Sequence, residues 1–513
     1  MRKCLSAVAA AAAGLLAATV VNVPVAQAHT SKTSGLSGRQ QANLRQIARD
    51  TWRFFETDVD PNTHLPLDNV GPGSTRGNYT SSANIGVYLW SVVAAHDLHL
   101  ISGPEATARV RSTMLEVQHL QRGHGFLYQW YDTTTGHVIL NPGQGDCAQV
   151  GGTTDNCSFL SAVDNGWYAS GLVVVRQALP GAAALATQLL NETDFSIFFD
   201  ARAQTDCNVN AAIDNQPTGQ MYGGYYAGVG PAGYHNGAIY SDPRIAMYLG
   251  MGLHQMPGDV WWRTWRVLPP KRCASDPDFS WQGQPQGPDT GYWTTITDPL
   301  SGKQFPVWEG HYTYPGTSLK FLPTFAGGMF EALMANEVVP ETTWGTRNFG
   351  LADVRAAQVQ IKYATEQLHY PVWGISPSST PDDTGGYNAY GADGATFPPG
   401  QQLAQCGTCA PETAVTPHAS FLALDVAPQQ AYANIQRLRA LYPDVYTADG
   451  GFYDAVNPTT GSVGHRRLVL DQSMIMAALD NALNGRRMQH WFAADPTANA
   501  ARQVLGVETM SLG

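Results

Sequence analysis

The residues best able to do chemistry in this sequence are five carboxylic acids. They stand at the expected starts of helices or within aromatic loops: Asp164, Asp242, Glu309, Glu331 and Asp471. Hydrolysis of a glycosidic bond requires two such groups, one protonated to release the leaving oxygen and one ionised. We expect Asp164 and Asp242 to face each other across a cleft, with Glu309 or Glu331 close by, and one of the first two to be the general acid.

Three of these acids have a competing structural explanation. Asp164, Asp242 and Asp471 each stand where an apolar helix is expected to begin, and Pro243 follows Asp242. Asp is favoured at the N-cap because its carboxylate accepts backbone N–H groups of the first turn, and Pro is favoured at the first helical position. On local sequence alone, capping explains these positions at least as well as catalysis does.

The other two acids lie in different surroundings. Glu309 is embedded among Trp308, His311 and Tyr312, a setting that fits neither a core nor a solvated face and therefore indicates a functional site. Glu331 follows two glycines, which permit close approach of backbone or ligand. The alternative for Glu331 is a solvated helix position.

The composition favours a carbohydrate ligand. The 513 residues include 13 Trp and 22 Tyr, only 14% are charged, and the formal net charge is −11. An aromatic ring can cover the apolar face of a sugar, whereas an acidic chain lacks the basic surface that nucleic-acid binding requires. Trp308, Tyr312, Tyr314 and Trp373 alternate with polar residues and are expected to line the cleft. The candidate substrate contacts are Trp130, Asn165, Trp308, His311, Tyr312, Trp373, Tyr387 and His418.

Other chemistries lack their motifs. The sequence contains no GxSxG, HExxH or P-loop, and its 14 His do not cluster at metal-ligand spacing. We therefore expect neither a cofactor nor a metal ion. Two other functions stay open: a polysaccharide lyase, which would use a Tyr/His or Arg pair beside a uronate, and a glycan-binding protein without catalysis, which would need no paired acids.

The N-terminus predicts export. Arg2 and Lys3 precede an apolar run over residues 5–23, and Ala26-Gln27-Ala28 is a small-residue cleavage site. We expect a signal peptide over 1–28, a flexible segment over 29–39 and a single domain over 40–513. The mature protein is expected to be secreted, without a membrane segment, and to be a monomer.

Six cysteines would remain after cleavage, an even number typical of disulfides in an exported protein. Local grouping suggests the pairs Cys147–Cys157, Cys406–Cys409 and Cys207–Cys273, although six cysteines allow 15 connectivities.

Helical periodicity recurs along the chain and predicts an all-α protein. The expected helices cover residues 37–56, 81–100, 102–121, 163–179, 181–199, 242–254, 324–338, 349–369, 417–441 and 470–493, the last two ranges each long enough for two helices. Ser102-Gly-Pro-Glu105 has the form of a capping box. About a dozen helices with long loops on one side are typical of an (α/α)6 toroid, in which β-hairpins and loops form a cleft on one rim. The alternative, an α-solenoid, would show a fixed repeat period, and none is found.

One internal similarity interrupts the helical pattern. Gly125-Phe126 precedes Thr134-Thr135-Gly136, and Gly451-Phe452 precedes Thr459-Thr460-Gly461. Residues 126–138 alternate around a turn and are expected to form a β-hairpin. The two segments indicate related positions on one rim of the fold.

Seven segments in chain order extend these observations. They are Gly125-Phe-Leu-Tyr-Gln-Trp-Tyr-Asp132, Ser161-Ala-Val-Asp-Asn165, Tyr240-Ser-Asp-Pro-Arg-Ile-Ala-Met-Tyr248, Gly327-Gly-Met-Phe-Glu-Ala-Leu333, Trp373-Gly-Ile-Ser376 with Gly386-Tyr387, Val415-Thr-Pro-His-Ala-Ser-Phe-Leu-Ala-Leu424 and Gly451-Phe-Tyr-Asp-Ala-Val-Asn457. Together they resemble the bacterial glucoamylase-like family, the (α/α)6 group that includes endo-β-1,2-glucanases and the glycan-processing domain of cyclic β-1,2-glucan synthases.

The resemblance implies a glycoside hydrolase, with β-1,2-glucan as the first candidate substrate and inversion as the expected outcome. It places cleft acids at Asp164 and Asp242. The second position is generally Glu in the family, so the side chain here is one methylene shorter. In the synthase relatives Glu follows the Gly-Ile-Ser segment, whereas Pro377 stands here, so no catalytic role carries over to that position.

Overall fold

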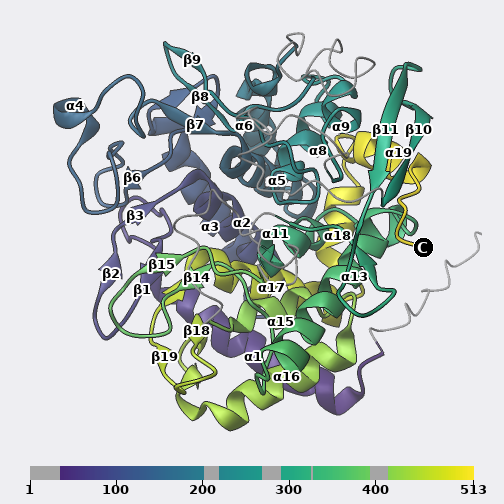
Figure 1. Cartoon of the computed structure of the whole chain (residues 1–513). Coiled ribbons are helices and arrows are strands. Elements are labelled where there is room, and N and C mark those ends of the chain that lie inside the picture. The colour runs from purple at the N-terminus through teal and green to yellow at the C-terminus, as the bar shows by residue number, and fades with distance from the viewer. Residues whose placement is uncertain (1–34, 202–218, 268–289, 325–326, 393–413) are drawn as a thin grey trace, which may run out of the picture. The chain divides into compact units, whose positions relative to one another are not determined.

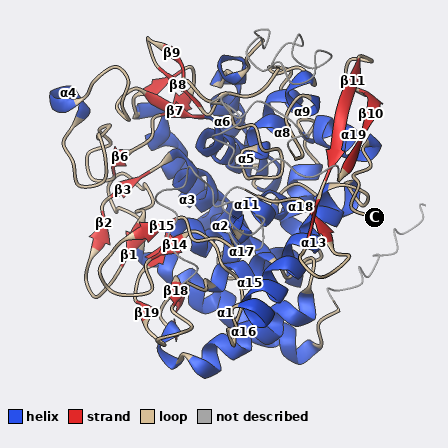
Figure 2. Cartoon of the chain, viewed as in Figure 1, coloured by secondary structure: helices blue, strands red, loops and turns tan. Residues whose placement is uncertain are grey.

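The computed structural model describes residues 35–201, 219–267, 290–324, 327–392 and 414–513, and these residues form many helices with short hairpins between them (Figures 1 and 2). Contacts group Thr33–Gly513 into one compact unit. The expected signal peptide lies outside the described residues, and the first helix begins at Gly38, inside the segment expected to be flexible. Among the described helices, none has both the length and the apolar character needed to cross a bilayer.

The described helices follow the expected order closely. They are α1 (Gly38–Thr57), α2 (Ser82–Asp97), α3 (Gly103–His119), α4 (Cys147–Val150), α5 (Ala162–Ala178), α6 (Ala183–Glu192), α8 (Arg244–Gly252), α9 (Asp259–Trp262), α11 (Met329–Leu333), α12 (Glu341–Trp344), α13 (Phe349–Lys362), α15 (Pro417–Leu422), α16 (Pro428–Leu441), α17 (Val469–Leu483), α18 (Arg487–Ala493) and α19 (Ala498–Val507). Residues 417–441 and 470–493 each hold parts of two helices, as their lengths suggested.

The strands are short, antiparallel and mostly paired in twos. The pairs are β3 (Tyr79–Thr80) with β6 (Tyr131–Asp132), β4 (Arg122–Gly123) with β5 (Phe126–Leu127), β10 (Gly291–Thr297) with β11 (Gln304–Gly310), β12 (Tyr312–Thr313) with β13 (Lys320–Phe321), β14 (Ser378–Ser379) with β15 (Tyr387–Asn388), β16 (Tyr446–Thr447) with β17 (Gly451–Phe452), and β18 (Ala455–Val456) with β19 (Val463–Gly464). Two sheets have three strands: β2 (Arg76–Gly77), β1 (Asn69–Val70) and β20 (Arg467–Leu468), and β7 (Phe159–Ser161), β8 (Gly224–Tyr226) and β9 (Gly230–Pro231).

Serine caps start the first three helices. Ser37, Ser81 and Ser102 each accept a hydrogen bond from the backbone N–H three residues later. The reciprocal half of the capping box expected at Ser102 is not formed, because the Glu105 carboxylate binds Arg109 at 3.0 Å instead. A side chain four residues ahead on the same helix face competes directly with the cap for that carboxylate.

Two helices are buried on nearly every side and form the centre of the core. All residues of α2 from 82 to 95 are buried, and so is every residue of α17 except the partly buried Leu470, as expected of helices enclosed by others. Gly86 of α2 and Gly171 of α5 allow their backbones to touch: a Cβ on Gly171 would lie 2.4 Å from the Gly86 carbonyl oxygen.

The contacts between helices form a series that returns to its start. α17 packs against α2, α2 against α5, and α5 against α8, while α11 packs against α15 and α15 against α17. Arg244 joins α8 to α11, because its guanidinium donates to the carbonyl oxygens of Glu331 and Ala332. Each of these six helices also packs against a helix outside the series: α1 on α17, α3 on α2, α6 on α5, α19 on α8, α13 on α11 and α16 on α15. α18 is a further neighbour of α5, α17 and α2.

Candidate active site

Several helices of this series carry a polar residue in their first turn. Asp164 of α5, Glu331 of α11 and Asp471 of α17 each occupy the third position after the N-cap, and Asn84 has the same place in α2. His418 lies in the first turn of α15. A helix dipole favours an anion at this end, so these positions can hold carboxylates that burial would otherwise make unfavourable.

The capping explanation for three of the acids is wrong. α5 is capped by Ser161, whose hydroxyl accepts the backbone N–H of Asp164 at 3.2 Å. Neither α8, which follows Asp242, nor α17, which contains Asp471, has a side-chain cap hydrogen bond. The carboxylates are therefore not used as helix caps.

The structure brings Asp164, Asp242 and Glu331 into one electrostatic group. Burial, and then the charge of Asp164, raises the pKa of Asp242 to about 7, against a hydrogen bond from the Ser241 hydroxyl at 3.1 Å. Burial raises the pKa of Glu331 well above its usual range, and the charge of Asp242 adds to this effect. Asp164 and Asp242 both remain partly exposed, so a ligand can reach them.

Asp164 has a partner that keeps its carboxylate in place. The Gln129 amide donates to its Oδ2 at 2.9 Å. Burial raises the pKa of Asp164, while the hydrogen bonds from Gln129 and Ser161 oppose the shift. Asp164 is therefore easier to ionise than burial alone would allow.

A second acid group lies beside the first. The His418 Nδ1 is 3.1 Å from the Asp471 Oδ2, and Asp454, after β17, shares a hydrogen bond with Asp471. Burial lowers the pKa of His418 to about 4 and raises that of Asp471 to about 7. Burial, and then the charge of Asp471, raises the pKa of Asp454 well above its usual range, so the two carboxyl groups titrate as a coupled pair.

Among the described residues, His418, Asp454 and Asp471 also offer ligand atoms that lie within 4.8 Å of one another, a spacing that could hold a metal ion. The absence of a metal ion from the mechanism stays a prediction.

Two residues connect the groups. Burial, then the charges of Asp471 and Glu331, raises the pKa of Tyr387, although the residue is 49% exposed. Asp68 also raises the pKa of Asp471, and it accepts a hydrogen bond from Asn84 at 2.8 Å. The candidate site therefore extends from Asp164 through Glu331 to Asp68.

Glu309 does not belong to this site. It is fully buried on β11, where it interacts with Glu508 and Arg266; Figure 1 places β11 beside α19, at the opposite side of the view from β3 and β6. Burial, and then the charge of Glu508, raises its pKa to about 9, so it is protonated at neutral pH. The Arg266 guanidinium binds Glu508 at 2.5 Å, which makes this a structural acid pair.

The aromatic residues expected in the cleft are mostly packed inside the protein. Trp308, Tyr312, Tyr314 and Trp373 are all at least 93% buried. Trp308 lies on the same hairpin as Glu309 and packs on Trp293, with ring centroids 5.6 Å apart. The prediction that they form exposed sugar platforms is wrong, because local alternation with polar residues here marks a two-stranded hairpin.

Asn165 and His311 serve local structure as well. Asn165 is fully buried, and its amide bonds both the N–H and the carbonyl of Leu127 at 2.9 and 3.0 Å, which fixes β5 on α5. The His311 Nδ1 lies 2.7 Å from the Ser511 hydroxyl near the C-terminus. Their predicted contact with a substrate has no support in this arrangement.

Trp130 keeps a position suited to the predicted role. It is partly exposed, follows Gln129, and packs edge-on against Tyr79 with centroids 5.6 Å apart. The substrate contacts of Trp130, Tyr387 and His418 stay predictions.

Sequence reasoning missed Gln129, Asp454 and Asp68. Gln129 and Asp454 follow the Gly-Phe pairs of the two similar segments, at Gly125 and Gly451, so the internal similarity was the signal that could have found them. Asp68 lies in a loop before β1 and carries no such signal.

Comparison with known proteins shows which sequences and folds the chain is similar to. The family described as "Putative glucoamylase" matches residues 297–494, and a family of unknown function, DUF3131, matches residues 46–215. The cyclic β-(1,2)-glucan synthase NdvB of Rhizobium meliloti is 25% identical over 536 residues; the match covers 90% of this chain but only 18% of that protein. The resemblance to the glucoamylase-like family is confirmed.

Solved structures of similar fold include members with glucanase activity. A glucoamylase-like protein of Bacteroides caccae superposes with a TM-score of 0.63 at 18% identity, covering 92% of this chain and 100% of its own. The endo-β-1,2-glucanase of Chitinophaga pinensis, in complex with sophorotriose and glucose, gives 0.62 at 14% identity, covering 92% and 98%. The β-1,2-glucanase of Parabacteroides distasonis gives 0.66 at 15%, covering 91% and 60%. At these identities the likeness establishes a shared glucoamylase-like fold.

Proposed function

We propose that this glucoamylase-like chain is a secreted, monomeric glycoside hydrolase that cleaves a glucan, with β-1,2-glucan as the first substrate to test. One observation carries the proposal: Asp164, Asp242 and Glu331 interact at the starts of three neighbouring helices, and the pKa of Asp242 is about 7. Acid–base hydrolysis of a glycosidic bond requires two carboxyl groups, one of which stays protonated near neutral pH.

We further propose that the six helices α2, α5, α8, α11, α15 and α17 form the inner ring of an (α/α)6 toroid. Their contacts return to the starting helix, and each also packs against an outer helix, with α18 a further neighbour of α2, α5 and α17. The acids at their first turns would then line one mouth of the ring, where the long loops form the cleft.

The roles follow from the surroundings of each acid. The Ser241 hydroxyl donates to Asp242, whose pKa burial raises to about 7, so Asp242 retains its proton near neutral pH and acts as the general acid on the leaving oxygen. Asp164 accepts the Gln129 amide and supplies the ionised group. General acid–base assistance of this kind contributes about 10²–10⁴-fold to the rate.

The substrate assignment rests on the similar proteins. The Chitinophaga pinensis enzyme binds sophorotriose and glucose, and NdvB is a synthase of cyclic β-1,2-glucan. Because the chain spans 18% of the length of NdvB, the synthase activity of that whole protein is not assigned here.

The test is a reducing-sugar assay of the mature chain on β-1,2-glucan, other glucans and a uronate polymer. We expect release of reducing ends from β-1,2-glucan, and a loss of about 10²–10⁴-fold in Asp242→Asn. Glu309→Gln is the matched control, since it also replaces a buried carboxyl group by an amide but outside the site, and should retain kcat per folded molecule. Unsaturated uronate products would identify a lyase, and binding without any new reducing ends would identify a glycan-binding protein.

A further inference from the structure

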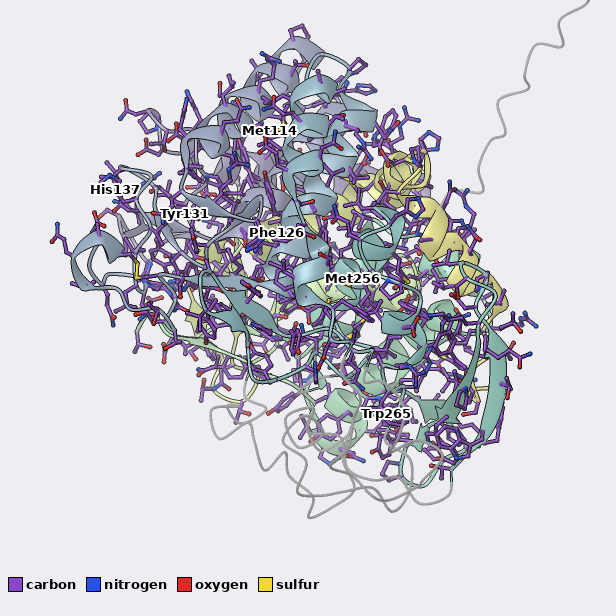
Figure 3. All side chains as sticks on the ribbon, turned by 90° about the horizontal axis from the view of Figure 1, so that it is seen from above. Met114, Phe126, Tyr131, His137, Met256 and Trp265 are labelled. Atoms are coloured by element: carbon purple, nitrogen blue, oxygen red, sulfur yellow. A yellow bond between two sulfur atoms is a disulfide. The ribbon has the colours of Figure 1, made fainter. Side chains whose placement is uncertain are left out.

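A cavity of about 570 Å³ lies beside the candidate site, between β2–β3 and the loop that follows β6. This volume is within the roughly 300–1,000 Å³ of pockets that take small ligands. Asn78, Tyr79, Thr135, His137, Gln144 and Asp146 contribute to its wall. In Figure 3, Phe126 lies toward the middle of the molecule, His137 lies at its edge, and Tyr131 lies between them. The wall of the cavity is therefore built where the chain runs outward from the core.

The lining is polar and mixed, and its charged side chains already have partners within the protein. The Arg76 guanidinium donates to the Thr57 carbonyl oxygen. The His137 Nδ1 lies 2.6 Å from the Asp146 carboxylate, and Asp132 accepts the backbone N–H groups of Thr134 and Thr135 at 2.9 and 2.8 Å. Amides, hydroxyls and Tyr79 complete the lining. Such a surface suits a ligand rich in hydroxyl groups, because it offers both hydrogen-bond donors and acceptors.

Tyr79 belongs to both the cavity and the candidate site. Its ring lines the cavity and packs against Trp130. Its hydroxyl accepts the Asn69 amide at 2.9 Å and shares a hydrogen bond with Asp68. Since Asp68 interacts with Asp471, Tyr79 and Asp68 connect the cavity to the second acid group.

The outer wall is held by covalent and backbone bonds. The disulfide Cys147–Cys157 closes the loop, and the Ile139 N–H donates to the Trp130 carbonyl at 3.1 Å, while the Leu140 N–H donates to the Gly145 carbonyl at 3.2 Å. A wall fixed in this way loses little freedom when a ligand binds.

We propose that this cavity is a remote sugar-binding subsite, which holds neutral sugar residues of a glucan chain beyond those at the acids. The proposal rests on the proposed function and deepens it. An enzyme with such a subsite gains affinity for long chains that reach it, and gains nothing for short chains that occupy only the acids.

The test compares chain lengths in a double variant, Asn78→Ala/Gln144→Ala. Both side chains are exposed, so the fold should survive. We expect kcat/KM on long β-1,2-glucan to fall roughly five- to tenfold, as for the loss of one or two hydrogen bonds, with kcat/KM on a short β-1,2-linked oligosaccharide unchanged. The control is Thr460→Ala, in the similar turn of the second segment, which should change neither value.

An equal effect on long and short substrates, or no effect on either, overturns the subsite while leaving the hydrolase intact. If the parent enzyme cleaves no glucan, the proposed function fails first. The subsite is then judged by calorimetric titration of Asp242→Asn, with and without the double change, using long and short glucans of the same panel. A weaker affinity for the long chain alone supports the subsite, and equal affinities overturn it.

Discussion

Two regions of the chain, residues 125–138 and 451–464, are built alike and meet their neighbouring helices in different ways. Each starts with a glycine of positive φ, 78° at Gly125 and 74° at Gly451, followed by a fully buried Phe. Each ends in a turn whose first side chain accepts two backbone N–H groups: Asp132 at 2.9 and 2.8 Å, and Asn457 at 2.9 and 3.1 Å.

The difference lies in the side chain that each region offers to the next helix. In the first, Gln129 donates an amide N–H to Asp164 of α5. In the second, the Asp454 carboxyl group shares a hydrogen bond with Asp471 of α17. The helix acids have the same position in the first turn, so the partner alone distinguishes the two arrangements.

This comparison explains how one scaffold can give acids of different character. The amide of Gln129 is a donor at every pH, and it favours the ionised form of Asp164. Asp454 is a donor only while it is protonated, so it and Asp471 titrate together and should be described by the pair. One region therefore presents a stable carboxylate, and the other a group that holds a proton up to neutral pH.

The largest expected effect concerns the first region. Asp164→Asn should lower kcat by about 10²–10⁴-fold, because it removes the ionised group that Gln129 supports. The fold should persist, since Ser161 caps α5. Measurement of kcat and Tm on the same variant checks this; unchanged turnover would remove Asp164 from the mechanism and leave Glu331 and Asp471 as the acids to test.

The starts of the two regions offer the next test. A Cβ on Gly125 would lie 1.9 Å from the backbone oxygen of Glu192, whereas a Cβ on Gly451 would first meet the Thr51 hydroxyl at 2.5 Å. Both positions have positive φ, but only the second clash is with a side chain that can rotate. We expect Gly125→Ala to cost more than about 3 kcal/mol and Gly451→Ala about 1–2 kcal/mol in urea unfolding. Equal losses would mean that the regions do not differ in packing.

Local signals in the sequence predicted the helices and the position of most acids. Helical periodicity gave the starts of α1 and α2, and the capping signal at Ser102 gave that of α3. Asp164, Asp242, Glu331 and Asp471 were found because they lie at helix starts. Their meeting in one group depends on the packing of helices up to 300 residues apart in the chain, which no local pattern encodes.

Glu309 shows the opposite case. Its aromatic neighbours in sequence suggested a binding loop, but the residue that determines its chemistry is Glu508, near the C-terminus. Trp308 and Tyr312 were misassigned for the same reason, since alternation cannot distinguish a cleft loop from a hairpin packed on the body. Gln129 and Asp454 could have been found by extending the internal similarity by a few residues.

The raised pKa of Asp471, the partner of Asp454 in the second region, should make the stability of the protein depend on pH. The pKa of Asp471 in the folded chain is about 7, above the roughly 3.9 of an unfolded Asp. The folded state therefore binds more protons between these values, and its free energy of unfolding falls as pH rises from about 4 to about 7. Asp471→Asn should flatten that slope, by an amount on the order of 2–4 kcal/mol over the whole range.

Asp164→Asn is the matched control for this slope. It should flatten the curve less than Asp471→Asn does, because the Gln129 donor already favours the charged form of Asp164. Urea unfolding of the three proteins at several pH values checks the order. A slope unchanged in Asp471→Asn, or changed more in Asp164→Asn, would contradict the assignment of the shared proton to the second region.

The smallest expected effect is an exchange between the two turns. Asp132→Asn and Asn457→Asp keep the Oδ1 that accepts the two backbone N–H groups, and each side chain lies in a partly exposed turn where a charge costs little. Each change should alter the free energy of unfolding by less than about 0.5 kcal/mol, whereas Asp132→Ala or Asn457→Ala, which remove the acceptor, should cost about 1 kcal/mol. If the exchange lowers the free energy of unfolding as much as the alanine changes do, the charge of the side chain matters in these turns. The two regions would then be similar only in their backbone conformation.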